Sequence, residues 1–396
     1  MQRKAKAKRH SIYILLFQLC VIADSVLGDD AEFYIISRGI MLLFFAGMLF
    51  RIMSHGGKIQ TSRSLLLPFV FLLYMTLSLI WAYNRELALA QYITEIQLFI
   101  LFFFTYYCMR EEGKIEDYLW AVYISGFLMA AYALYKYGGF SGYTSIMQTG
   151  RRLGGEIANE NTFGQIFANA SLIALYLAIM KGKRIHYLSL VIFLFFGFSS
   201  GSKKFVFLVA AGVVGIALIH FGLRRIYKTL IGSAVLLYAG TWALQLPMFS
   251  TINKRFQSYI SGNLNKSDVG RKEMIRFGID LFKQRPVFGY GLNNYRHFYN
   301  GYYSHNNFVE LLACLGLVGF VLYYAMYFDP VVFFIRQWIR KSITFCNEHK
   351  MLLFLLGVNL VFGYGMVQVY DKQVWLLLGV AIAAKDSILK QQVSEV

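Results

Sequence analysis

Residues 64–109, SLLLPFVFLLYMTLSLIWAYNRELALAQYITEIQLFILFFFTYYCM, contain two long apolar stretches on either side of one short polar segment. The first stretch covers residues 64–82 and the second covers residues 88–109. An α-helix needs about 20 apolar residues to cross the hydrocarbon core of a bilayer, where every backbone polar group must be paired within the protein. This part of the chain is therefore expected to form two transmembrane helices joined by a tight turn.

Similar apolar stretches recur along all 396 residues, of which 57% are hydrophobic and only 15% are charged. A soluble chain carries about 25% charged residues, so this one lacks the polar surface of a water-soluble globule. The composition also argues against a disordered chain, a disulfide-stapled secreted module and a nucleic-acid-binding domain. We expect an all-α, polytopic integral membrane protein, with residues 1–396 forming a single membrane domain. The twelve predicted spans cover residues 11–27, 33–53, 64–82, 88–109, 117–137, 161–180, 186–200, 204–221, 229–246, 307–328, 350–369 and 373–389.

The cysteines and the first residues of the chain carry little further information. Cys20, Cys108, Cys314 and Cys346 are scattered one per segment, with no CxxC pair and no cysteine–histidine cluster. Neither a disulfide framework nor a structural metal is indicated. The basic start, MQRKAKAKRH, leads into the first apolar stretch without a clear small-residue cleavage site. We therefore expect that stretch to be retained as the first span.

The formal net charge of +18 comes from 39 Lys and Arg residues against 21 Asp and Glu residues. In a membrane protein, short basic connections stay in the cytoplasm. The connections that follow even-numbered predicted spans are of this kind, for example KGKRIH at residues 181–186. Both termini are therefore predicted to lie in the cytoplasm, as an even number of spans requires.

Two connections on the opposite side are long: residues 138–160, and residues 247–306 between the ninth and tenth spans. The second carries nine basic residues against three acidic ones, which breaks the charge pattern. An anionic partner on the outer face, such as a lipid phosphate, would explain this excess. Long translocated loops also tolerate charge irrespective of topology, so the charge alone leaves both interpretations open.

Within the second long connection, DVGRKEMIRFGIDLFKQRPVFGYG predicts a helix with Asp268 as its N-cap and with Pro286 and Gly289 at its end. Apolar side chains at helical spacing form one stripe, so the helix should lie on the membrane surface with that stripe facing down. Arg271 heads the apolar stripe. Either it snorkels back to water or it points toward a phosphate at the headgroup level.

His305 lies in YYSHNN, where the second long connection enters the tenth span. A histidine near the membrane surface titrates near neutral pH and is suited to accept a proton from a sugar hydroxyl. The alternative is a polar interface residue without a chemical role. The nearby Arg271 favours the chemical interpretation.

The first long connection places Arg151 and Arg152 among glycines. Glycines let the backbone approach a ligand closely, and a guanidinium grips phosphate oxygens in a bidentate manner. A flexible basic turn is the alternative. GRRLGGE is not a P-loop, because it lacks the GK[ST] ending.

Taken together, these segments resemble the O-antigen polymerase and ligase superfamily, whose members handle polyprenyl-diphosphate-linked glycans on the outer face of the bacterial inner membrane. The resemblance covers most of the chain and depends on the order of short motifs. These are SLIWAYNRELALA (78–90), RRLGGEIANENTFG (151–164), FGFSSGSKKFVFL (196–208), VGR (269–271), RPVFGYG (285–291) and SHNNFVELLACLGLVG (304–319).

The resemblance implies a GT-C-like membrane glycosyltransferase that needs no cofactor. By its motifs, Arg151 or Arg152 together with Arg271 would hold the donor diphosphate, and His305 would activate the acceptor hydroxyl. The superfamily often has Ser-Arg where this chain has Ser202-Lys203, so a role for that position is less secure. Supporting roles would fall to residues near the catalytic pair: Glu310, Glu156, Asn306, Tyr303 and Arg276.

Such a reaction requires stabilisation of a departing diphosphate and deprotonation of a hydroxyl, which arginine and histidine supply without a metal. We expect inversion of the anomeric carbon. A metal-dependent enzyme would use a carboxylate cluster, and the nearest one is Asp29, Asp30 and Glu32 in a short external connection.

Four functions remain open at this point. The first is a polymerase of O-antigen, capsule or exopolysaccharide, in which donor and acceptor are both polyprenyl-diphosphate-linked repeat units. The second is a ligase that passes the glycan to lipid A core or another acceptor. A flippase or transporter would show related halves and charged residues deep in its spans, and neither is evident. A noncatalytic assembly scaffold is the last alternative. A flippase and a chain-length regulator of the same pathway are the expected protein partners, and no nucleic acid is expected.

Overall fold

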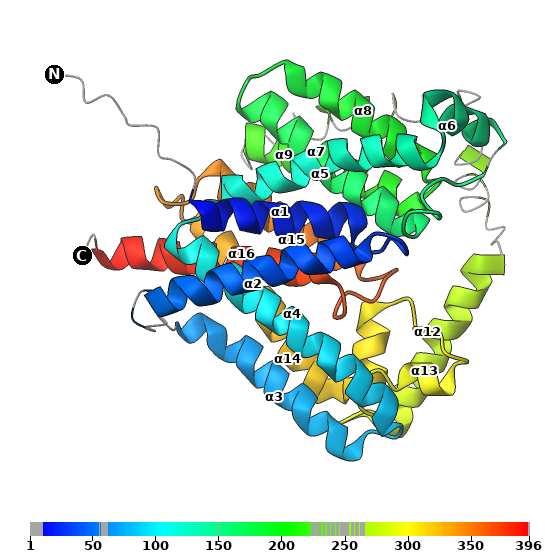
Figure 1. Cartoon of the computed structure of the whole chain (residues 1–396), viewed down its shortest axis with the longest axis vertical. Helices are drawn as coiled ribbons and strands as arrows, with labels where there is room; N and C mark the ends of the chain where they lie inside the picture. Colours follow the sequence, from blue (N-terminus) through cyan, green and yellow to red (C-terminus); the bar gives the residue numbers. More distant parts are fainter. Residues whose placement is uncertain are drawn as a thin grey trace.

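The computed structural model describes residues 11–54, 62–149, 151–222 and 266–394, together with a few isolated residues between these ranges. All regular secondary structure in these ranges is helical (Figure 1). The helices are α1 (Ile12–Leu27), α2 (Tyr34–Ser54), the 3-10 helix η1 (Arg63–Leu65), α3 (Leu66–Trp81), α4 (Arg85–Glu111), α5 (Ile115–Lys136), α6 (Gly139–Gln148), α7 (Glu160–Met180), α8 (Ile185–Ser199), α9 (Lys203–Phe221), α12 (Lys266–Gln284), α13 (Tyr295–Phe298), α14 (Asn307–Ile339), α15 (Asn347–Phe362) and α16 (Lys372–Ser394).

Helices occupy eleven of the twelve predicted spans, and the remaining span, 229–246, lies outside the described residues. Seven of these helices are long and apolar enough to cross a membrane by length and composition. The protein is therefore an integral membrane protein. A total of twelve spans, a likeness to the GT-C fold and the placement of residues 138–160 and 247–306 outside the membrane stay predictions.

Small residues allow the helices to pack closely, as is usual in membrane proteins. A side chain at Gly126 of α5 would collide with Ala170 of α7 and Phe193 of α8, and one at Gly212 of α9 would collide with Leu172 of α7. α7 is consequently buried along nearly its whole length between α5, α8 and α9. α16 packs against α4, where the Asp386 carboxylate accepts a 2.6 Å hydrogen bond from Tyr106.

The motif RPVFGYG holds the end of α12 against a break in α14. α14 loses its helical geometry at Gly316, whose φ of 64° is left-handed. The amide of Gly291 donates to the Cys314 carbonyl (2.7 Å), and the amide of Leu317 donates to the Pro286 carbonyl (2.8 Å). A Cβ at Gly316 would collide with the Val287 carbonyl, which explains the glycine at this position. The RPVFGYG motif and the break in α14 are thus held together by backbone hydrogen bonds.

Two local predictions need correction. α12 begins at Lys266, so Asp268 lies inside the helix and is not its N-cap; the helix does end at Gln284, just before Pro286. The connection 138–160 also contains a helix, α6, which the glycines of GGFSG conceal in the sequence. α6 forms because Tyr143 and Met147, one turn apart, are both buried against the bundle.

The start of α1 and the end of α16 lie at the same end of the bundle, on the left in Figure 1. The other end of the bundle gathers the ends of α1 and α5, the starts of α7, α9 and α16, and the segment that leads into α14. Residues predicted to lie outside the membrane therefore meet at one end of the molecule.

Candidate functional site

His305 lies in the segment that leads into α14, and buried hydrogen bonds fix this segment. Its φ of 53° is left-handed, which is uncommon for a residue other than glycine. On one side, the Ser304 amide donates to the Glu310 carboxylate at 2.9 Å. On the other side, Asn306 caps α14 by accepting from the Val309 amide at 3.1 Å. Glu310 has no exposed surface, so its carboxylate serves the backbone of this segment.

Asn307 ties the same segment to the connection between α15 and α16. Its amide donates to the Gly363 carbonyl at 2.7 Å. Its side-chain oxygen accepts from the amides of Gln368 and Val369, each at 2.8 Å. Asn307 was absent from the sequence-based candidates, although the Asn-Asn pair after the histidine was a visible signal. The segment that carries His305 is thus tied to a second segment about 60 residues further along the chain.

A large, mostly apolar cavity of about 520 Å³ opens on one side of His305, between α9, α12 and α15. Apolar side chains of these helices form most of its walls. Among the residues that the structure describes, four cationic side chains and no carboxylate line the cavity: Lys203 and Lys204 from α9, and Arg271 and Lys272 from α12. We call it the basic cavity. Its combination of apolar walls and positive charge suits a lipid with a phosphate headgroup.

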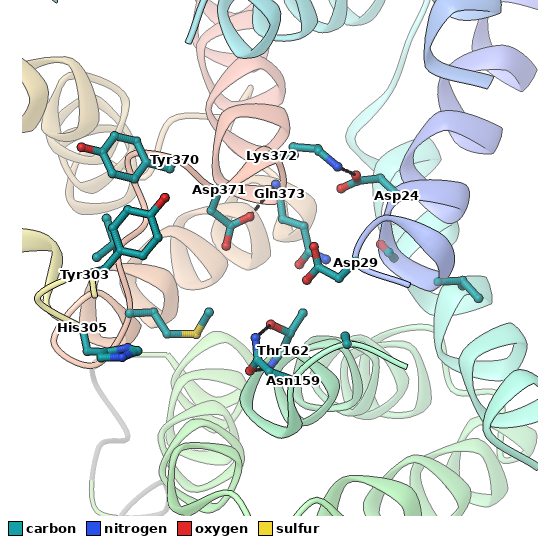
Figure 2. A pocket seen from close by; sticks show the side chains of 15 residues that line it. Asp24, Asp29, Asn159, Thr162, Tyr303, His305, Tyr370, Asp371, Lys372 and Gln373 are labelled. Atoms are coloured by element: carbon teal, nitrogen blue, oxygen red, sulfur yellow. Dashed lines mark hydrogen bonds and ion pairs between the residues drawn. The ribbon is translucent and has the colours of Figure 1, made fainter. Parts of the chain in front are cut away.

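A second cavity of about 370 Å³, at the end of α1 and the starts of α7 and α16, also has His305 in its wall. Figure 2 shows the polar side chains that point into it. We call it the acidic cavity, because three carboxylates and one ammonium group line it in addition to His305. The charged and polar lining residues are Asp24, Asp29, Asp371, Lys372, Ser25, Asn159, Thr162, Gln373, Tyr303 and Tyr370.

The surroundings of His305 favour its neutral form. The ring is accessible through the two cavities, yet the protein around it removes enough water to lower its pKa from the usual 6.5. The positive charges of Arg271 and Lys204 lower the pKa further. Neutral imidazole carries an unprotonated nitrogen, so His305 is able to act as a base at neutral pH.

Lys204 is a site residue that the sequence did not single out, because the superfamily motif draws attention to Lys203. The Lys204 ammonium donates to the Gly365 carbonyl and lies 5.1 Å from the centre of the Phe362 ring. Arg271 and Arg152 both act on it electrostatically. Three cations from three separate segments therefore interact at Lys204, and two of them, Lys204 and Arg271, also act on His305.

The structure separates the two adjacent arginines of the first long connection. Arg151 is largely exposed and forms a 3.1 Å ion pair with Glu156. Arg152 turns inward, where its Nε donates to the Ser200 carbonyl at 2.9 Å and its Nη2 donates to Asn161 at 3.3 Å. Of the two, Arg152 is the one beside Lys204 and the turn between α8 and α9. It does not itself line the basic cavity.

The remaining predicted residues occupy less central positions. Arg276 is exposed on α12 and lines neither cavity. Tyr303 lines the acidic cavity, where its ring lies 5.7 Å from the Tyr370 ring and 4.5 Å from the Arg296 guanidinium. Glu156 pairs with Arg151 and lines neither cavity.

The carboxylates of the first short connection do not act as one group. Asp30 is buried and accepts from Tyr132 at 2.7 Å and from the Glu32 amide at 2.8 Å. Glu32 pairs with Lys136 at 2.7 Å, whereas Asp29 faces the acidic cavity. Among the residues that the structure describes, no three His, Cys, Asp or Glu side chains gather closely enough to hold a metal ion.

Comparison with known families gives one match. Residues 170–324 match the family model described as O-Antigen ligase. The matched part, less than half of the chain, contains Lys204, Arg271 and His305 but neither Arg152 nor the carboxylates of the acidic cavity. The resemblance to the O-antigen polymerase and ligase superfamily is confirmed by this match. No curated protein matches the sequence.

Proposed function

Given that this chain shares the O-antigen ligase family's sequence pattern over residues 170–324, we propose that it is a glycosyltransferase of that superfamily and, within it, a polymerase of cell-surface polysaccharide. The donor is a glycan on a polyprenyl diphosphate, and the acceptor is a sugar hydroxyl of a lipid-linked repeat unit. The reaction takes place on the extracytoplasmic face of the bacterial inner membrane, with both termini in the cytoplasm.

One observation carries this proposal: His305 borders both cavities, and the two cavities have opposite charge. A transfer between two substrates requires both to reach one base. A polyprenyl diphosphate is anionic at its head and apolar along its chain, which matches the basic cavity. A sugar with many hydroxyl groups matches the polar walls of the acidic cavity.

The residues around His305 supply the chemistry that the transfer needs. The acceptor oxygen bonds to the anomeric carbon as that carbon's bond to the diphosphate oxygen breaks, and the bond's electron pair leaves with the diphosphate. Arg271 and Lys204 stabilise the departing negative charge, while Arg152, which also pairs with Glu160 at 3.6 Å, adds to the positive field at Lys204. The acceptor's proton moves to the neutral ring of His305. Attack opposite the leaving group inverts the anomeric centre.

A ligase is the main alternative, since it shares the donor and differs only in the acceptor. The resemblance of residues 304–319 to polymerases favours the polymerase. A flippase is less well supported. Arg271 and Lys204 lie beside the neutral ring of His305, and a proton acceptor next to phosphate-binding cations serves a reaction, whereas transport alone does not need one. A flippase and a chain-length regulator of the same pathway are the proposed partners in the membrane.

The test is complementation of a strain that lacks this protein with the His305→Ala variant. We expect loss of chain extension and accumulation of lipid-linked units with a single repeat, while the protein level in the membrane is unchanged. His297→Ala, in the same connection but outside both cavities, is the matched control and should support normal extension. Accumulation of long lipid-linked polymer would identify a ligase. Normal polymer from His305→Ala would overturn the role of the histidine.

A further inference from the structure

The acidic cavity is built like a site for one small polar molecule. Its volume of about 370 Å³ falls within the range of roughly 300–1,000 Å³ that is typical of small-molecule sites. Four parts of the chain form its walls, namely the end of α1, the start of α7, the segment that leads into α14 and the connection from α15 to α16 (Figure 2). Because His305 belongs to the wall, a molecule in this cavity presents its groups directly to the base.

The balance of charge in the cavity is negative. Lys372 is the one ammonium group that the described residues place in the wall, and the Asp24 carboxylate pairs with it at 2.9 Å. That pair leaves Asp29 and Asp371. Asp371 accepts from the Gln373 amide at 2.8 Å and points into the cavity. In the described part of the chain, no hydrogen-bond or ion-pair partner of the Asp29 carboxylate is found.

The two carboxylates also influence each other. Burial raises the pKa of Asp371 to about 7, and the negative charges of Asp29 and Asp24 contribute to this. Burial and the charge of Asp24 likewise raise the pKa of Asp29. Both groups are thus placed where further negative charge is unfavourable and where a hydrogen-bond donor is favourable.

The rest of the wall suits a sugar. Asn159, Thr162 and Gln373 offer amide and hydroxyl groups, and the rings of Tyr303 and Tyr370 offer apolar faces. A metal ion fits less well, because the three carboxylates do not gather into a ligand set among the described residues. An anionic sugar or a phosphate would place its charge beside Asp29 and Asp371, whereas the basic cavity offers four cations across His305.

We infer that the acidic cavity is the acceptor subsite and that it selects a sugar without an anionic group, either neutral or amine-bearing, against uronic acids and phosphorylated sugars. This inference rests on the proposed function and adds to it the class of the acceptor. The carboxylates do two things at once. They accept hydrogen bonds from the acceptor hydroxyls, and they keep the donor diphosphate out of the acceptor side.

The test measures binding and does not depend on turnover. The full chain in lipid nanodiscs is titrated at pH 8 with two disaccharide probes, N,N′-diacetylchitobiose, which is uncharged, and digalacturonate, which carries two carboxylates. We expect digalacturonate to bind at least about tenfold more weakly, the size of effect that one unfavourable charge contact in a partly buried site produces. Saturation-transfer NMR with competition supplies the two dissociation constants.

Two variants assign the selectivity to the cavity. Asp371→Asn keeps an oxygen that accepts from the Gln373 amide, so the start of α16 should persist, and it should narrow the difference between the probes to about threefold. Asp29→Asn should act in the same direction. Asp280→Asn, on the exposed face of α12 and paired with Lys283, is the control and should leave the difference unchanged.

The outcomes separate this inference from the proposed function. Equal binding of both probes to the unmodified protein, or a difference that survives Asp371→Asn and Asp29→Asn together, would overturn the charge selection. Transfer activity would then still stand. A protein that shows the expected selectivity but transfers no glycan from lipid-linked units would overturn the proposed function and leave a charge-selective sugar site.

Discussion

The two cavities that share His305 differ in the charge and polarity of their walls. Residues of α9, α12 and α15 line the basic cavity, which has apolar walls and four cations, whereas α1, α7 and α16 line the acidic cavity, which has polar walls and three carboxylates. Two substrates that both carry sugars are hard to tell apart by their sugars alone. The opposite charges of the two cavities at His305 sort them by the part that each presents there: the donor presents its diphosphate, and the acceptor presents a sugar hydroxyl.

After His305→Ala, the largest expected effect comes from removing the Arg271 guanidinium at the donor diphosphate. Arg271→Ala should lower turnover by about 10²–10³, the effect of losing one group that stabilises developing negative charge. Turnover of lipid-linked units by the purified protein in nanodiscs is the measurement. Arg271→Lys should recover only part of the activity, because a single ammonium cannot grip two phosphate oxygens in a fork.

Lys283→Ala is the control on the same helix, since that side chain is largely exposed and pairs with Asp280 at 3.1 Å. It should leave turnover unchanged. If Arg271→Ala and Lys283→Ala behaved alike, the basic cavity would lose its assignment as the donor site.

Lys204 provides a second, smaller way to weaken the basic cavity. Lys204→Gln should lower activity by at least about tenfold, which corresponds to a charge-assisted hydrogen bond of about 1.5–3 kcal/mol. The loss should appear in both the KM for the donor and kcat, because the ammonium contacts the diphosphate before and after the bond breaks. A variant with full activity and unchanged donor KM would contradict this role.

Glu310 lines neither cavity and holds the segment of His305 by accepting a hydrogen bond from the Ser304 amide. Glu310→Ala should leave the buried Ser304 amide without an acceptor, at a cost of about 1–3 kcal/mol in the free energy of unfolding. Activity should fall because His305 is no longer held, while donor binding should persist. Glu310→Gln retains an oxygen acceptor and is expected to recover both the melting temperature and most of the activity. Donor affinity that fell together with turnover would indicate general disruption.

The smallest effect is a shift in the pH profile. Burial, Arg271 and Lys204 disfavour the charged imidazolium, so they lower the pKa of His305 from 6.5. Since the neutral ring is the base, kcat/KM should fall as the pH falls through this lowered pKa, with a midpoint below 6.5. In Lys204→Gln one cause of the lowering is gone, and the midpoint should move up toward 6.5. A downward movement would contradict the electrostatic coupling.

Eleven of the twelve predicted spans, and the meeting of Arg271 and His305 at one cavity, could be predicted from the sequence, because both depend on local signals. Apolar stretches are visible as composition, and Arg271 and His305 interrupt otherwise regular patterns. Asp268 is not the N-cap of α12, because the helix begins two residues earlier, at Lys266. α6 was missed because the glycines at its start obscured the face that it buries. Arg151 and Arg152 were indistinguishable in sequence, and only packing turned one outward and the other inward.

The sequence by itself determined that this chain forms membrane helices, because bilayer thickness and the need to pair backbone groups act on each segment separately. It also showed which side chains were unusual. Only the tertiary structure decided what surrounds His305. Asp24 and Asp371 are separated by most of the chain, and Lys204 and Arg271 come from different helices, so their fields add at the histidine only once the bundle has packed. The net charge of the residues that line each cavity therefore depends on how the helices pack.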